Sequence, residues 1–488
     1  MEVQDLKKKT ISSLFWKLLE RGGNSLVQLV VQIIMARLLA PEEFGALAIM
    51  LVFVNIGNVI VQSGLNTAIV QAKEVDDVDL STVFWMSFGV SLVLVVIFYI
   101  SSPLVAEYYV MPHIIWPLRF LGLLMLVTAF NSVQVAIVQR ELQLRKVFNA
   151  TLASVLFSGT IGIVSAVAGA GLWALVLQQF AYQVTSCFVL GLQVKWLPSI
   201  SFDGFKARKH FSYGWKLLLS GILDQGYQSL SDLMIGKQFS TLSLGLVSQG
   251  KKYPQALGTM LDGAIQPVML SAVSRIQDDK GGVKRLIRRA LKTSTFLIAP
   301  SMTLFAVSAS PIVSLLLGDK WLPCVPFLQM YCFVYALLPI HTTNLQALNG
   351  MGRSDLFIKL EVIKKTYGIC CILFAAFVLK NVYAMVAMYM LTSVVSTFVN
   401  AWPNKRVIGY SYLEQIRDVG PVFLLSAAAG VLSLWCGSFV PVPIIQVLVE
   451  ACAMAVVYLG LACMFKLEAF YYLARLLRGL VGSRWARD

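Results

Sequence analysis

The sequence predicts an all-α, polytopic membrane protein of about fourteen transmembrane helices, and three observations support this fold class. Of the 488 residues, 58% are hydrophobic and 13% are charged, whereas soluble domains carry roughly 25% charged residues. The apolar residues fall in repeated blocks of about 20, the length that a helix needs to cross a bilayer. Lys and Arg are distributed unevenly between alternate loops, which is typical of polytopic membrane proteins.

The apolar blocks are bounded by charged residues, Pro and Gly, and these boundaries predict each span. The predicted spans cover residues 12–38, 43–64, 82–102, 115–137, 148–168, 171–193, 211–236, 242–270, 291–310, 325–348, 355–378, 382–402, 418–438 and 442–465. Charged residues lie within the first, seventh and eighth of these spans.

The loop charges predict the orientation of the chain in the membrane. Most Lys and Arg of the loops fall on one side, and the other side receives only Arg37, Lys237, Lys320 and Lys380. Positive loops remain in the cytoplasm, so both termini are expected there. Residues 467–488 place aromatic and aliphatic residues between arginines at helical spacing, which predicts a basic amphipathic cytoplasmic tail on the inner leaflet.

Composition and motifs argue against several other classes of protein. The net charge of +15 suggests nucleic acid, but no zinc-ligand spacing or RNA-binding motif accompanies it, so no nucleic-acid partner is expected. No Walker A loop is present, which excludes ATP hydrolysis by this chain. The eight cysteines form no CxxC pair and read as small buried residues. We expect a transporter, not an enzyme, with no cofactor and no bound metal.

The sequence resembles itself at an offset of about 200 residues. Trp16-Lys17 aligns with Trp215-Lys216, and Gly45 aligns with Gly245. Matched polar positions predict two homologous six-helix lobes around a central cavity, related by an axis along the membrane normal, with two extra C-terminal helices. The predicted domains are 1–200 (N-terminal lobe), 201–404 (C-terminal lobe), 405–466 (two additional helices) and 467–488 (tail).

Polar and charged side chains recur at helical spacing on the first two helices of each predicted lobe. The stripes comprise Lys17, Glu20, Arg21, Asn24 and Gln28; Asn55, Asn58 and Gln62; Lys216, Asp224 and Tyr227; and Lys252, Gln255, Thr259 and Asp262. Ionisable groups inside a membrane usually face a bundle interior or a wet cavity. We therefore expect these four helices to line one central cavity.

Roles within this cavity follow from charge. The cations expected to bind a pyrophosphate are Lys17, Arg21, Lys216 and Lys252, because Lys and Arg hold phosphate well. The candidates for ion coupling are Glu20, Asp224 and Asp262. The remaining stripe residues are expected to line the cavity as neutral polar groups.

Two features of these stripes leave alternatives open. Lys17 and Arg21 can instead snorkel to the inner headgroups, with Glu20 paired to Arg21. Pro254 removes a helical hydrogen bond in the middle of its span, so it is either a hinge or a static kink.

Several longer phrases resemble a known family. They are ARLLAPEEFGALAIMLVF from Ala36, QSGLNTAIVQ from Gln62, LQLRKVF from Leu142, SRIQDDKGGVKRLIRRALK from Ser274 and LLLGDKWLPCVPFLQMYCF from Leu315. In this order and spacing they resemble the polysaccharide-transporter branch of the MOP flippase superfamily, most closely exporters of the Wzx and colanic-acid type. The resemblance covers most of residues 10–400.

The resemblance implies a function and a setting. Such proteins flip a polyprenyl-pyrophosphate-linked oligosaccharide from the inner to the outer leaflet of the bacterial inner membrane by alternating access, for exopolysaccharide, capsule or O-antigen. It also implies membrane lipid as surroundings, and a polysaccharide polymerase and a chain-length regulator as partners. A cation-coupled multidrug antiporter and a peptidoglycan lipid-precursor flippase of the same superfamily are the alternatives. The site residues above rest on the polar stripes and not on a family motif.

Overall fold

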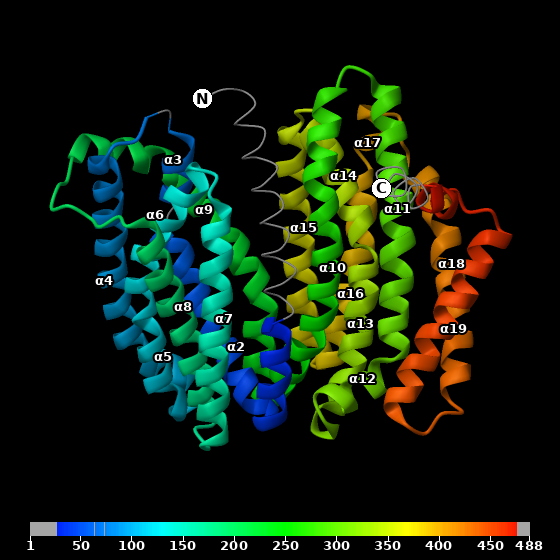
Figure 1. Ribbon diagram of the computed structural model, residues 1–488, viewed down its shortest axis with the longest axis horizontal. Helices are drawn as coiled ribbons and strands as arrows, with labels where there is room; N and C mark the ends of the chain where they lie inside the picture. Colours follow the sequence, from blue (N-terminus) through cyan, green and yellow to red (C-terminus); the bar gives the residue numbers. More distant parts are fainter. Residues whose placement is uncertain (1–26, 63, 73, 476–488) are drawn as a thin grey trace, which may run out of the picture. The chain divides into compact units, whose positions relative to one another are not determined.

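The computed structural model describes residues 27–62, 64–72 and 74–475 (Figure 1). These residues form helices and connecting turns, without a β-strand among them. The chain divides into two compact units, Met1–Ser248 and Gln249–Asp488.

The first unit begins, in its described part, with a helix over Val27–Leu38. The helices that follow are α2 (Pro41–Gln62), α3 (Leu65–Gln71), α4 (Asp77–Tyr108), the 3₁₀ turn η1 (Pro112–Ile114), α5 (Ile115–Gly122), α6 (Leu124–Arg140), α7 (Leu144–Val167), α8 (Leu172–Val194) and α9 (Gly204–Gln238).

The second unit contains all but the first turns of α10 (Thr241–Arg275). Its other helices are α11 (Lys280–Val307), α12 (Ala309–Leu316), the 3₁₀ segment η2 (Asp319–Cys324), α13 (Val325–Ala336), α14 (Leu338–Gly350), α15 (Ser354–Phe374), the π-helical segment η3 (Ala375–Leu379), α16 (Val382–Ala401), α17 (Asn404–Val407), α18 (Tyr412–Gly437) and α19 (Pro443–Met464). A further helical segment covers residues 468–475.

The prediction of an all-α polytopic membrane protein is confirmed. Eleven helices in the described part of the chain are long and apolar enough to cross a membrane, and each overlaps one of the predicted spans. Two further predicted spans coincide with α9 and α10, which are 35 residues long each and are not among these eleven. The described half of the first predicted span is also helical. The total of fourteen spans stays a prediction.

Two of the predicted spans are interrupted where the sequence pattern suggested one helix. The span 115–137 divides into α5 and α6 at Leu123, and the span 325–348 divides into α13 and α14 at Leu337. Pro339 lies in the first turn of α14, where its missing N–H is tolerated but a continuous helix is not. Hydropathy alone does not detect such breaks, because both halves remain apolar.

In the first unit, α2 and the first turns of α10 approach each other so closely that only glycine fits. A Cβ on Gly45 would lie 1.9 Å from the carbonyl oxygen of Thr241, and a Cβ on Gly245 would lie 2.0 Å from that of Pro41. The two contacts are reciprocal, and their partners differ by 200 in residue number. This offset is the one at which the sequence resembles itself.

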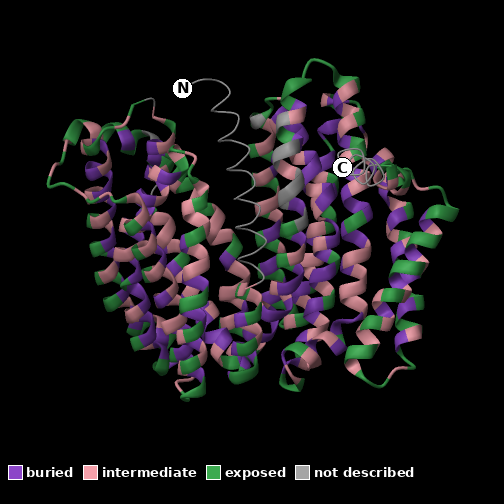
Figure 2. Cartoon of the chain, viewed as in Figure 1, coloured by how far each residue is buried: buried purple, intermediate pink, exposed green. Residues whose placement is uncertain are grey.

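The second unit is held together by two buried apolar clusters. One joins α10, α11 and α14 with Ile408, Tyr410 and α18, and the other joins α11, α18 and α19 with the segment after α19. Figure 2 shows buried and exposed residues alternating along the helices. Large apolar side chains such as Leu424 and Val456 are exposed, as a lipid-facing surface requires.

Candidate functional site

Helix α9 carries three of the predicted site residues, and its N-terminal end is fixed by charge. Asp203 caps the helix, accepting hydrogen bonds from the N–H groups of Phe205 and Lys206 at 2.8 and 3.2 Å. This is the usual role of an Asp N-cap. The capped turn places Lys206 where it can reach the beginning of α4.

A cluster of ionisable groups joins the N-terminal ends of α4 and α9. Lys206 Nζ lies 2.5 Å from Asp76 and 3.2 Å from Asp79, and His210 Nε2 lies 2.9 Å from Asp79. The hydrogen bond from Lys206 holds the pKa of Asp76 well below its usual range, and Asp76 in turn raises the pKa of Lys206. Both groups therefore stay charged at neutral pH and fix the end of α9.

Helix α9 packs directly against α2, so two of the predicted polar stripes lie on neighbouring helices. The contact is made by small residues: a Cβ on Gly221 would lie 2.9 Å from Val59, and one on Gly64 would lie 2.8 Å from the carbonyl oxygen of Gly214. Gly64 also has φ +67°, a conformation that glycine adopts most easily. The chain can therefore turn at the end of α2 while it stays in contact with α9.

On α9, Lys216 is exposed, and Asp224 and Tyr227 are half-buried. Asp224 accepts a hydrogen bond of 2.7 Å from the amide of Gln228. These groups occupy a helix that is otherwise rich in apolar residues.

On α2, Asn55 and Gln62 are exposed and Asn58 is half-buried. Asn58 accepts a hydrogen bond of 2.9 Å from Thr128 on α6, and Thr128 accepts one of 3.4 Å from Gln183 on α8. Asn58 therefore joins three helices within the first unit. Asn55 and Gln62 have the exposure expected of lining residues.

Helix α10 is helical through Pro254, which is buried. A Cβ on Gly250 would lie 2.9 Å from the backbone N of Leu328, and one on Gly258 would lie 3.0 Å from Tyr335. These two glycines seat α10 against α13. Lys252 is half-buried, and the remaining predicted residues of this stripe, Gln255 and Thr259, are exposed.

Asp262 is the predicted site residue with the most complete set of contacts. Its side chain is 3% exposed. It accepts hydrogen bonds from the hydroxyl of Thr342 at 2.6 Å and from the amide of Gln266 at 2.5 Å. In the described residues no Lys, Arg or His forms an ion pair with it. A buried carboxylate held by neutral donors is costly to keep charged and usually has a function.

The structure adds a polar group on α14 and α16 that the stripes did not predict. His341 precedes Thr342 on α14, and its Nε2 lies 3.3 Å from the hydroxyl of Ser393. The amide of Asn400 lies 3.2 Å from Nδ1 of the same ring. Because these partners are on α16, they could not be inferred from spacing within one helix.

A charged pair on α15 was also missed. Lys364 forms an ion pair with Glu361, and Tyr367 bonds to the hydroxyl of Ser396 on α16. Both charges lie inside the predicted span 355–378, so the rule applied to the first two helices of each lobe would have found them if extended to every span.

Some predicted site residues lie outside the described residues, namely Lys17, Glu20, Arg21 and Asn24. Gln28, the last residue of that stripe, is exposed on the helix over Val27–Leu38. The convergence of four helices on one cavity, and the hinge at Pro254, stay predictions. In the described part of the chain no group of three His, Cys, Asp or Glu side chains is arranged to hold a metal ion.

The fold is that of a polytopic membrane protein. A family model described as "Polysaccharide biosynthesis protein" matches residues 34–326, more than half of the chain. The chain belongs to this family of polysaccharide biosynthesis proteins. The resemblance identified from the sequence phrases is thereby confirmed.

Three relatives are similar to this chain over most of its length. It is 23% identical to the lipopolysaccharide biosynthesis protein WzxC of Escherichia coli (strain K12), covering 88% of both chains. It is 22% identical to the teichuronic acid biosynthesis protein TuaB of Bacillus subtilis (strain 168), covering 88% of this chain and 89% of TuaB. It is also 22% identical to the succinoglycan biosynthesis transport protein ExoT of Rhizobium meliloti (strain 1021), covering 91% and 90%.

Solved structures share the fold. A lipid II flippase MurJ in an inward closed conformation superposes with a TM-score of 0.72 at 14% identity, covering 93% of this chain and 98% of that one. An inward-facing multidrug transporter of the MATE family and MOP superfamily gives a TM-score of 0.58 at 15% identity, covering 79% and 95%. At these identities the likeness concerns the fold alone.

Proposed function

We propose that the protein flips a polyprenyl-pyrophosphate-linked oligosaccharide from the cytoplasmic to the outer leaflet of the bacterial inner membrane. The observation that carries the proposal is the family match over residues 34–326, which includes both polar helices, α9 and α10. Relatives named for lipopolysaccharide, teichuronic acid and succinoglycan biosynthesis support a saccharide cargo. They differ in polymer, so the sugar is left to experiment.

The composition of α9 and α10 supports a polar cargo path. Each has 35 residues, roughly 52 Å at 1.5 Å per residue, and can cross a hydrocarbon layer of about 30 Å. Their charged and amide groups are costly in contact with lipid, and such helices usually line water. A headgroup of sugars and diphosphate requires this kind of lining, while its polyprenyl chain stays in the bilayer.

Lys216 and Lys252 are the described cations proposed to receive the diphosphate, together with Lys17 and Arg21 of the first predicted span. Lys binds phosphate as a point charge. Asp262, with Asp224 and Glu20, is proposed to couple cargo movement to an ion. Alternating access then exposes these groups to one side of the membrane at a time.

A deletion in the native host tests the proposal. Lipid-linked saccharides are extracted, identified by mass and assigned to a leaflet, and a plasmid copy serves as the rescue control. We expect one lipid-linked repeat unit to accumulate on the cytoplasmic face while surface polymer is lost. Accumulation of a peptidoglycan precursor, or drug sensitivity without any accumulation, would contradict the proposal and favour the other members of the superfamily.

The proposed orientation has its own test. A reporter fused after Asp488 is expected to be active only in the cytoplasm, and one inserted at Asn381, beside Lys380, only outside it. Asn381 is the N-cap residue of α16. The opposite pair of signals would overturn the topology without bearing on the cargo.

A further inference from the structure

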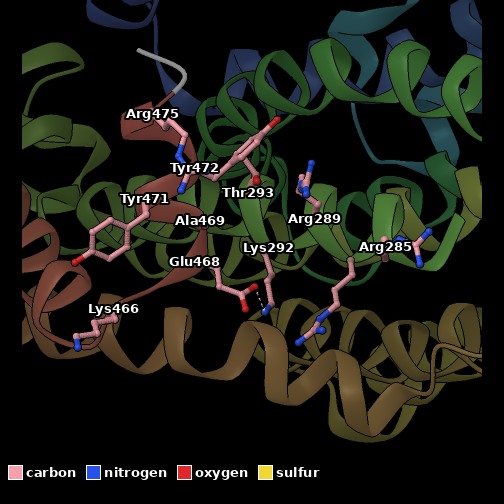
Figure 3. Close-up of a pocket in the computed structure, with 11 residues that line it drawn as sticks. Arg285, Arg289, Lys292, Thr293, Lys466, Glu468, Ala469, Tyr471, Tyr472 and Arg475 are labelled. Atoms are coloured by element: carbon pink, nitrogen blue, oxygen red, sulfur yellow. Dashed lines mark hydrogen bonds and ion pairs between the residues drawn. The ribbon is translucent and has the colours of Figure 1, made fainter. Parts of the chain in front are cut away.

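A basic pocket lies in the second unit. It has a volume of about 470 Å³ and is bounded by the N-terminal half of α11 and by the segment after α19 (Figure 3). Its cationic lining consists of Arg285, Arg288, Arg289, Lys292, Lys466 and Arg475. Glu468 is the acidic residue among its lining side chains.

The segment after α19 is fixed on α11 by specific contacts, so the pocket is a built feature. Lys292 Nζ lies 2.8 Å from Glu468 of this segment, and α19 itself is held to α11 by a hydrogen bond of 3.0 Å that Tyr458 donates to the carbonyl of Phe296. The rings of Phe296 and Phe470 are 6.4 Å apart, within one buried apolar cluster. The basic pocket therefore lies beside this apolar cluster.

Part of the positive charge is already neutralised. Arg288 forms two hydrogen bonds of 2.7 Å with Asp418, and Lys292 bridges Asp418 and Glu468 at 2.9 and 2.8 Å. Arg285 lies 3.7 Å from Asp279. These pairs fix the geometry of the α11 side and use up the carboxylates near it.

Three cations remain in excess. Arg289, Lys466 and Arg475 form no ion pair with any carboxylate of the described residues. The guanidinium of Arg289 lies 5.1 Å from the centre of the Tyr472 ring, and in the view of Figure 3 Arg289 and Arg475 lie to the right and left of Tyr472. Two guanidinium groups that line one pocket present donors that an anion can bind, because Arg binds phosphate in bidentate fashion.

The surroundings of the pocket resemble a membrane interface. Tyr471 and Tyr472 are 43% and 37% exposed, and Leu297, about one turn along α11 from Thr293 of the pocket, is 43% exposed. Tyrosine is enriched at the boundary between headgroups and acyl chains. An exposed apolar residue next to a basic pocket suits a ligand that carries both a phosphate and hydrocarbon chains.

We propose that this pocket, between α11 and residues 466–475, binds the phosphate headgroup of an acidic phospholipid of the cytoplasmic leaflet. Basic pockets between transmembrane helices on this side bind such headgroups. Arg289 and Arg475 hold the phosphate, Tyr472 separates them, and the acyl chains run along the outer surface of α11. The site goes beyond the proposed transport function and does not depend on the identity of the cargo.

The test uses the purified full-length chain in phosphatidylcholine nanodiscs with and without 10 mol% cardiolipin, with lipid retention after detergent extraction measured by native mass spectrometry. Each cation near an anionic headgroup contributes about fivefold to affinity. The double variant Arg289→Gln/Arg475→Gln should therefore retain cardiolipin about 25-fold less well. The matched control Lys405→Gln/Arg406→Gln removes two exposed cations of α17 and should retain it normally.

Two further arms make the result decisive. Arg289→Lys/Arg475→Lys keeps the charge and should retain most of the lipid, which separates charge from misfolding. Inorganic pyrophosphate at millimolar concentration should displace little cardiolipin, since it lacks acyl chains. Equal retention by the Gln double variant and its control would overturn the site, and full displacement by pyrophosphate would overturn the lipid in favour of a soluble phosphate.

Discussion

At the residue scale, Asp76 joins two helices through a contact that depends on pH. Its pKa is lowered in the folded chain, first by the hydrogen bond from Lys206 and then by the backbone N–H of Asp79. A carboxyl group whose pKa falls on folding stabilises the folded state above its usual pKa of about 4 and loses this effect as acid protonates it. The connection between α4 and α9 therefore weakens in acid.

Asp76→Asn is expected to lower the unfolding temperature at pH 7, because it removes the charge that Lys206 binds. The difference from wild type should shrink as the pH falls below about 4. Thermal unfolding in detergent across this range measures it. Asp77→Asn is the control, since Asp77 is exposed in the same turn and should change little; a constant difference at all pH values would contradict the account.

Thr342 is the residue that satisfies Asp262 from a second helix. Replacing Thr342 with Val keeps the shape but removes the hydroxyl that donates at 2.6 Å. Leaving a buried acceptor with one donor fewer costs about 1–3 kcal/mol, so Thr342→Val should lower the free energy of unfolding by that amount. Thr259→Val is the comparison: Thr259 is exposed and bonds only within its own helix. Equal effects of the two would refute the proposed importance of the Asp262 contact.

At the element scale, the close contact between α2 and the first turns of α10 requires glycine on both sides. Gly45→Ala and Gly245→Ala would each place a methyl group about 2 Å from a backbone carbonyl, which no side-chain rotation relieves. We expect a loss above about 3 kcal/mol, seen as loss of folded protein in size-exclusion profiles. Gly89→Ala on α4, where no atom lies within 4 Å of the added carbon, should fold normally. Normal folding of all three would show that the contact is absent.

Most elements could be predicted from the sequence because each span is defined by its own hydropathy. Eleven spans follow from that pattern alone. The breaks at Leu123 and Leu337 could not be predicted, since they depend on local backbone geometry within apolar sequence. The sequence repeat pairs Gly45 with Gly245, but it does not predict that the two helices touch there, because a contact between helices depends on their packing.

The candidate site shows a similar division. Spacing along one helix identified Asp262, Lys252 and Lys216 as polar positions in otherwise apolar surroundings. It could not identify Thr342, which lies 80 positions from Asp262, nor His341, which precedes Thr342 in the sequence. Contacts between helices depend on packing, and packing is not encoded in the period of a single segment.

At the scale of the whole molecule, the central claim is the proposal that the long polar helices α9 and α10 carry the headgroup of a lipid-linked saccharide. Purified chain reconstituted in liposomes with a lipid-linked saccharide tests it most directly, with the share of saccharide accessible to an external enzyme measured over time. Wild type should move the saccharide across the bilayer, and Lys216→Ala and Lys252→Ala should each slow this at least tenfold, the loss expected for about 1.4 kcal/mol of phosphate binding. Lys405→Ala is the matched control and should transport normally. Equal rates for all four proteins would contradict the proposal that α9 and α10 carry the headgroup.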